Sequence, residues 1–148
     1  MYTQNAVRSR YSIDNLETAS GPRIVVLCFD RLDRDLAHAL AAIDRQDHFE
    51  TNSTLGHAQD LLSEMATMLD VGAWEHAGAL LSVYDYLLRL LACANATKNG
   101  PMVRESARLV AELGAAFRAG ASVTSEIADA TTDGVVATEA MQRFSVRA

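Results

Sequence analysis

The stretch LLSVYDYLLRLLACAN, residues 80–95, is apolar nearly all the way round when it is read as a helix. With about 3.6 residues per turn, one wide stripe runs along it. The stripe is formed by Ala77, Leu80, Leu81, Tyr84, Leu88 and Leu91. Further apolar residues lie off its centre, namely Val83, Tyr86, Leu87 and Leu90. The pattern predicts a helix from about Glu75 to Ala96 with neighbours on two sides.

A helix of a four-helix bundle has two neighbours and one outer face. The off-centre residues therefore either complete the packing against those neighbours or line an apolar groove on the outside. A groove of this kind accepts an amphipathic helix of another chain. The sequence leaves both possibilities open.

Two amphipathic helices are expected before this one. Residues 22–45 begin with Pro22, which suits a first helical position because its missing N–H would have no partner there. Their apolar stripe consists of Ile24, Leu27, Cys28, Leu32, Leu36, Ala39, Leu40 and Ile43. The next helix is expected to run from a cap at Asn52 or Ser53 to about Leu69.

A fourth helix is expected over residues 102–119, and Gly120 is expected to end it. No stretch of the chain alternates with period two, so we expect no strand. Four helices joined by short loops predict an all-α fold, an antiparallel up-down-up-down four-helix bundle. The bundle is expected to occupy residues 20–120, between a lead-in segment (1–19) and a C-terminal tail (121–148). For the tail, a mobile segment and a marginal helix around 135–144 both stay open.

Composition narrows the classes of function. The chain has 148 residues and a formal charge of −6, and 49% of its residues are hydrophobic, which is too apolar for a disordered protein. The negative charge disfavours a nucleic-acid partner. We expect no membrane span, because no 18 consecutive residues are apolar, and the polar N-terminus does not resemble a signal peptide, which favours a cytoplasmic protein. Cys28 and Cys93 are expected to be small buried hydrophobes, although a disulfide stays open.

The chemistry that helical bundles usually carry is not evident in the sequence. Di-iron bundles need two Glu-x-x-His pairs, and the nearest match is a single Asp35-x-x-His38, which we interpret as a solvated helix face. The sequence has no HExxH, CxxC or GxSxG motif. We therefore expect no catalytic residue, no metal and no cofactor.

Histidine phosphotransfer is the enzymatic alternative for a helical bundle. His57 is the candidate phosphoryl acceptor, but Asp60 follows it by three residues and would repel a phosphoryl group. We interpret His57 as a polar helix position. A structural bundle that oligomerises through residues 75–96 is the other alternative.

Five segments, in order, resemble the FliS family of flagellar export chaperones. They are YSIDNLETAS (11–20), VLCFD (26–30), HAQDLLSEMATMLD (57–70), VYDYLLRLLACAN (83–95) and LVAELGAAFRAG (109–120). The fourth segment, with its Tyr-Asp-Tyr and Ala-Asn pieces, is the most specific. The chain departs from the family pattern at Gly21-Pro22-Arg23, where the family has Pro-Glu directly after Thr-Ala-Ser, and in its longer tail.

The resemblance implies a chaperone that wraps itself in the disordered C-terminal segment of flagellin, with the flagellar export gate as a further possible partner. The resemblance also implies that Tyr11 and Leu16 form a plug over part of a groove. Together with the pattern of residues 75–96, it gives the candidate partner-binding residues Tyr11, Leu16, Tyr84, Tyr86, Leu87 and Asn95. The sequence leaves open whether the protein is a monomer or a homodimer.

Overall fold

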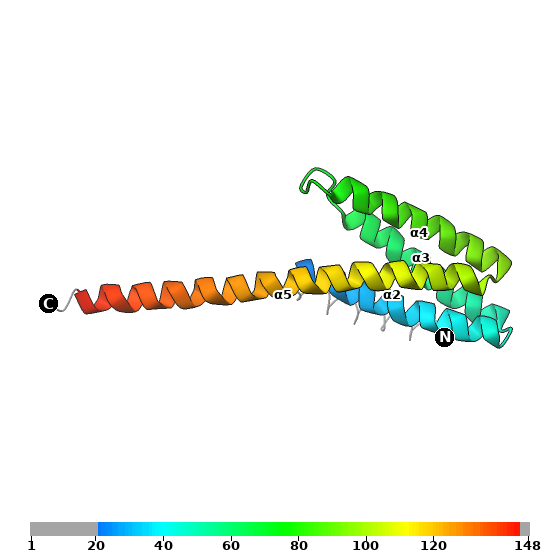
Figure 1. The fold of residues 1–148 in the computed structure, drawn as a ribbon, viewed down its shortest axis with the longest axis horizontal. Coiled ribbons are helices and arrows are strands. Elements are labelled where there is room, and N and C mark those ends of the chain that lie inside the picture. Colours follow the sequence, from blue (N-terminus) through cyan, green and yellow to red (C-terminus); the bar gives the residue numbers. More distant parts are fainter. Residues whose placement is uncertain (1–20, 146–148) are drawn as a thin grey trace, which may run out of the picture.

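The computed structural model describes the backbone of residues 21–145 and the side chains of residues 21–122. This part of the chain contains four helices and no strand: α2 (Gly21–Asp44), α3 (His48–Met68), α4 (Ala77–Thr97) and α5 (Gly100–Ser145). Each helix packs against the next, and α5 also packs against α2, which closes the bundle (Figure 1). The predicted all-α four-helix fold is confirmed. The lead-in segment lies outside the described residues.

The core is built from residues that recur at three- and four-residue steps on each helix. The largest fully buried apolar side chains are Phe29, Leu32 and Leu36 of α2, Leu55 and Leu62 of α3, Leu87 and Leu91 of α4, and Val103 and Val110 of α5. The ring of Phe29 stacks on Phe117 at 5.3 Å between centroids and lies 6.5 Å from Tyr84. Aromatic contacts therefore join α2, α4 and α5.

The second helix begins earlier than predicted. Asp47, not Asn52 or Ser53, caps α3, and its side chain accepts the backbone N–H of Glu50 at 3.0 Å. Thr51 is fully buried and donates its hydroxyl hydrogen bond to the Asp47 carbonyl at 2.7 Å. The first turn is thus held by both a cap and a buried side chain.

The last helix does not end at Gly120. Helix α5 continues to Ser145 and projects beyond the end of the bundle at which α2 begins (Figure 1). A glycine ends a helix when it adopts a left-handed conformation, and no glycine in the described part of the chain does so. In a right-handed helix a glycine costs only about 1 kcal/mol relative to alanine. The residues around 135–144 are therefore helical, as part of α5.

Among the four main interfaces between helices, the one between α4 and α5 is the smallest. Figure 1 shows α4 diverging from α5 toward the N-terminal end of α4. On the opposite side of α5, Arg118 forms ion pairs with Asp30 and Asp33 of α2. One side of α5 is thus firmly joined to α2, and the side toward α4 is less covered.

Within the described residues, α4 is the one helix that is long and apolar enough to cross a membrane. Length and composition alone give this result, and core helices of soluble proteins also meet the criterion. The buried residues of α4 are Ala77, Leu80, Tyr84, Leu87, Leu91 and Ala94, which repeat at steps of three and four. This face packs in the core of the bundle, and 33% of the apolar stretch of the helix is buried.

Candidate functional site

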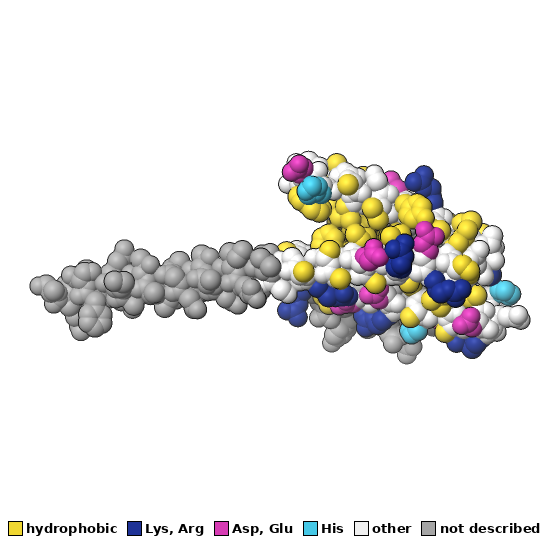
Figure 2. All heavy atoms as spheres, in the orientation of Figure 1, with side chains coloured by type: hydrophobic (Ala, Val, Ile, Leu, Met, Phe, Trp, Pro, Cys, Tyr) yellow, Lys and Arg dark blue, Asp and Glu magenta, His cyan; other side chains and the backbone are white. Residues whose placement is uncertain are grey.

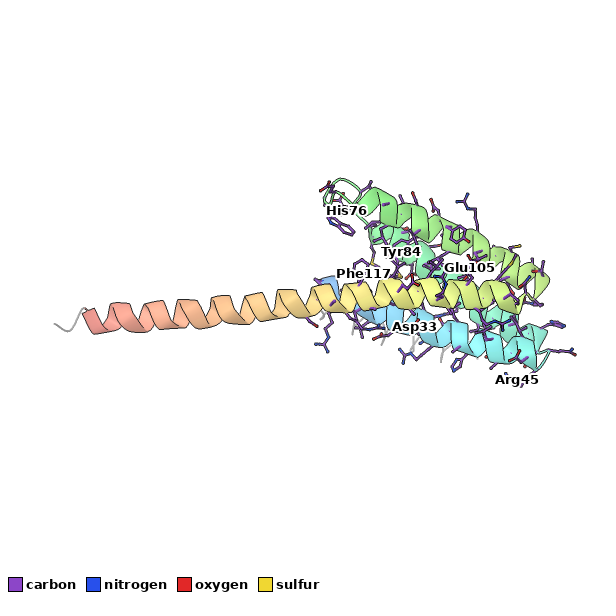
Figure 3. All side chains as sticks on the ribbon, in the orientation of Figure 1. Asp33, Arg45, His76, Tyr84, Glu105 and Phe117 are labelled. Carbon is purple, nitrogen blue, oxygen red and sulfur yellow. The ribbon has the colours of Figure 1, made fainter. Side chains whose placement is uncertain are left out.

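A hydrogen bond between α4 and α5 shows which faces of the two helices meet on the outside of the bundle. The hydroxyl of Tyr86 donates to Oε1 of Glu105 at 2.7 Å, and 43% of Tyr86 is exposed. Figure 3 shows Glu105 on the side of α5 toward α4. The bond therefore marks the outer edge of the space between the two helices.

Apolar side chains lie beside this bond on both helices. Residues three and four positions apart share a helix face, which places Val83 and Leu90 beside Tyr86, and Met102 and Leu109 beside Glu105. All four are partly exposed. Figure 2 shows hydrophobic side chains gathered in the hollow between α4 and α5. We call this hollow the α4–α5 groove.

The groove opens toward the loop that joins α3 to α4. Three large apolar residues there are exposed: Met68 (58%), Val71 (51%) and Trp74 (47%). The indole of Trp74 packs edge-on against His76 at 5.5 Å. Figure 3 shows His76 and Phe117 at the same end of the bundle. The exposed apolar surface of the loop therefore lies at the end from which α5 projects.

The two tyrosines of α4 are in different environments. Burial raises the pKa of Tyr84 to about 12, because the ionised phenolate would have to be desolvated. The pKa of Tyr86 is also raised, mainly because its neutral hydroxyl donates to Glu105. Both phenols are therefore neutral at physiological pH, and Tyr86 presents a polar hydrogen-bonded tip beside an apolar ring.

The structure separates the predicted partner-binding residues of α4. Tyr84 (2% exposed) and Leu87 (0%) lie in the core, so neither side chain is presented to a partner in this conformation. Tyr86 lies at the groove. Asn95 is half-buried and accepts Lys98 Nζ through its side-chain oxygen at 2.9 Å. Lys98 also donates to Asn52 of α3, so Asn95 belongs to a contact that joins the ends of α3 and α4.

Tyr11 and Leu16 lie outside the described residues, and the plug stays a prediction. Partner binding by the other four residues also stays a prediction.

A second polar cluster joins α2 to α3. Asp35 is 5% exposed, which corrects the interpretation of Asp35 and His38 as one solvated face. The carboxylate of Asp35 lies 2.6 Å from Nδ1 of His57 and accepts Nε of Arg31 at 3.2 Å. A buried carboxylate needs such partners. His57 is therefore more than a polar helix position, because its side chain joins α3 to α2 through a hydrogen bond.

The cysteines also differ from each other. Both are free, Cys28 is buried as predicted, and Cys93 is exposed, which contradicts its prediction as a buried residue. Among the described residues, no group of three or more His, Cys, Asp or Glu side chains could hold a metal ion.

Sequence reasoning missed Glu105 and the loop residues Val71 and Trp74. The side on which Glu105 lies depends on how α4 and α5 pack, and no local pattern shows that. The sequence DVGAW, residues 70–74, did contain a signal, because two large apolar residues stand in a short turn.

The comparison with protein families gives one match. The family described as flagellar protein FliS matches residues 3–124 of the chain. No curated protein matches the chain.

Proposed function

The chain belongs to the FliS family of flagellar export chaperones, and from this premise we propose that it binds the disordered C-terminal segment of flagellin in the α4–α5 groove. The observation that carries the proposal is the groove itself, with partly exposed apolar side chains on both helices and the smallest of the four main interfaces of the bundle. An amphipathic helix fits a surface of this kind. Bound in this way, flagellin is kept from polymerising before export.

A disordered flagellin segment needs a large contact area on the chaperone to offset the free energy that its ordering costs. A disordered segment that folds on binding loses about 2–5 kcal/mol of the interaction energy to ordering, and such interfaces bury roughly 1,000–3,000 Å². The groove and the exposed apolar loop at its open end give one surface for this contact. The proposed action is stoichiometric binding in the cytoplasm without catalysis, and the export gate is a proposed second partner.

The first test measures binding of a flagellin C-terminal peptide of roughly 40 residues, a length that suits coupled folding. We expect Tyr86→Ala to weaken binding by about 1–2 kcal/mol, since aromatic residues are frequent anchors of interfaces. The stability of the Tyr86→Ala variant to urea should change little, because the ring of Tyr86 is exposed. Tyr86→Phe keeps the ring and removes the bond to Glu105, so it separates anchoring from hydrogen bonding.

Phe49→Ala is the matched control. Phe49 is 83% exposed and lies in the first turn of α3, at the end of that helix away from the α3–α4 loop. Its loss should leave both binding and stability unchanged. Equal binding by the wild type and Tyr86→Ala, or equal weakening by Phe49→Ala, would remove the groove from the proposal.

Two alternatives make different predictions. Phosphotransfer through His57 requires an acid-labile phosphoryl group on that residue when a cognate kinase is supplied. Structural self-association requires a defined oligomer that does not bind flagellin peptides.

A further inference from the structure

The side of α4 that faces away from the bundle has no neighbour in the described part of the chain. The main partners of α4 are α3 and α5, and Figure 1 shows α4 at the outside of the bundle. Helix α4 has the most apolar composition of the four helices. Six exposed residues recur along this side at alternating steps of four and three, and we call them the α4 outer face: Gly78, Ser82, Asp85, Arg89, Ala92 and Ala96.

Two opposite charges lie at the middle of the α4 outer face. Asp85 and Arg89 are four residues apart, a spacing at which they could pair with each other along the helix. Among the described residues, however, neither side chain takes part in an ion pair. The other four members are small and uncharged, so a second helix can approach the face closely. Both charges are therefore available to groups on another chain.

The α4 outer face is complementary to itself when two copies pack antiparallel. A two-fold axis level with Leu87 sets Asp85 opposite Arg89 of the second copy, and Arg89 opposite the second copy's Asp85. A parallel pair would instead set each charge against its own equivalent, and opposed like charges are unfavourable. The charges therefore favour the antiparallel arrangement.

The remaining members of the face fit the same register. Ser82 is set opposite Ala92 of the second copy and Gly78 opposite Ala96, because each pair is centred on residue 87. Alternating steps of four and three are the spacing at which two helices pack along a common seam. No pair in this register joins two large side chains, so the two helices can lie close together.

We propose that this protein forms a homodimer in which α4 packs antiparallel against α4 of the second copy through the α4 outer face. The inference does not rest on flagellin binding. Val83 and Leu90 of the α4–α5 groove lie about 100° or more around the helix from the centre of the outer face. The dimer contact is thus centred away from the groove.

The size of the face indicates a weak and reversible dimer. A helix of 21 residues is about 30 Å long and about 12 Å wide, so a pair of such helices covers roughly 700 Å² in total. Stable interfaces bury about 1,200–2,000 Å², and smaller ones belong to transient complexes. We therefore expect the monomer at low protein concentration and the dimer at high concentration.

Two other occupants fit the α4 outer face less well. A lipid surface would have to accept Asp85 and Arg89 at the centre of the contact, where an interfacial helix carries apolar residues. A flagellin helix would have to supply its own Arg and Asp at the matching spacing. The second copy supplies both groups without any further assumption.

The first test exchanges the two charges and follows the dimer by sedimentation equilibrium over a series of protein concentrations. Asp85→Arg alone and Arg89→Asp alone oppose like charges twice across the two-fold axis, and each should raise the Kd of dimerisation about tenfold or more. The double variant, with Asp85→Arg and Arg89→Asp, restores both opposite pairs. Its Kd should return to within about threefold of the wild type.

The control is Asp60→Arg, which makes the same charge change as Asp85→Arg at an exposed position of α3. It should change the Kd of dimerisation by less than about twofold. A wild type that stays monomeric up to about 1 mM would overturn the inference, since even a weak specific dimer forms at that concentration. Equal effects of Asp85→Arg and Asp60→Arg, or a double variant no better than the single ones, would overturn it as well. Weaker binding of a flagellin peptide by Asp85→Arg, with a monomeric wild type, would assign the face to the client instead.

The second test reads the direction of the helices by disulfide cross-linking in a Cys93→Ser background. Ser82→Cys with Ala92→Cys should give a covalent dimer under mild oxidation, because the two positions lie opposite each other across the axis. They are about 15 Å apart along one helix, too far for a disulfide within one chain. Ser82→Cys alone should give no covalent dimer. A dimer from that single variant would indicate parallel helices, and no dimer from the double variant would contradict the register, so either result would overturn the inference.

Discussion

The carboxylate of Asp35 on α2 lies 2.6 Å from Nδ1 of His57 on α3, so a buried acid and a half-exposed base join two helices. An ionised carboxylate only accepts hydrogen bonds, and Nδ1 of His57 is then the donor. The other carboxylate oxygen accepts Nε of Arg31. The buried charge of Asp35 is thereby satisfied on both oxygens.

Removing one partner of the Asp35–His57 pair should lower the free energy of unfolding by more than the intact pair contributes to it. We expect His57→Ala to lower the free energy of unfolding by about 1–3 kcal/mol, because Asp35 stays buried with one partner fewer. Replacing both residues, with Asp35→Leu and His57→Ala, should recover part of this loss. Urea unfolding measures both values. The control is His38→Ala, at an exposed position of α2, which should change stability by less than about 0.5 kcal/mol.

Two glycines of α5 should respond in opposite ways to larger residues. A Cβ on Gly114 would lie 3.3 Å from Cβ of Phe29, whereas one on Gly120 would meet no atom within 4 Å. Gly114→Leu should lower stability by about 1–3 kcal/mol through overpacking against α2. Gly120→Ala should raise it by about 0.5–1 kcal/mol, because alanine favours the helix.

Thermal unfolding followed by circular dichroism checks both glycine variants. Gly120→Leu is the control for size alone and should be close to neutral. A stable Gly114→Leu protein would show that α2 and α5 do not pack as closely as described.

The sequence predicts the helices better than their ends and their rotation. Residues 22–45 were expected to be helical and α2 spans Gly21–Asp44, because a long amphipathic pattern averages over many positions. The cap of α3 was placed at Asn52 or Ser53 because Asp, Asn and Ser cap about equally well and local chemistry does not rank them. The predicted helix end at Gly120 is wrong, because only the φ of a glycine decides whether it ends a helix and the sequence does not show that angle.

The face that α2 turns toward the core depends on the helices packed against it, and no local sequence pattern shows this. The predicted stripe included Leu27, which is 39% exposed, and omitted Phe29, which is fully buried. Phe29 fits there because Gly114 of α5 has no side chain beside the Phe29 Cβ, and the ring of Phe117 stacks on the ring of Phe29. That space is made by a residue 85 positions later in the chain. For the same reason, periodicity could not show that Tyr86, and not Leu87, borders the groove.

The buried tyrosine should make the protein sensitive to alkali. The pKa of Tyr84 is raised from 10.0 to about 12, so the folded state binds its proton more tightly than the unfolded state. Its contribution is fully present below pH 10 and is lost as the pH rises toward 12. The loss should amount to about 2 kcal/mol. Tyr84→Phe should abolish this part of the pH dependence, as measured by urea unfolding across that range.

The two cysteines should react with thiol reagents at very different rates. Cys93 is exposed, whereas burial and the nearby charge of Glu64 raise the pKa of the Cys28 thiol and disfavour its reactive thiolate. In the native protein we expect one thiol to react quickly and the second to react only as the bundle opens. Cys93→Ser should remove the fast phase and Cys28→Ala the slow one. Fast labelling of Cys28 would mean that the core between α2 and α4 opens readily, because Cys28 packs in the same buried cluster as Tyr84.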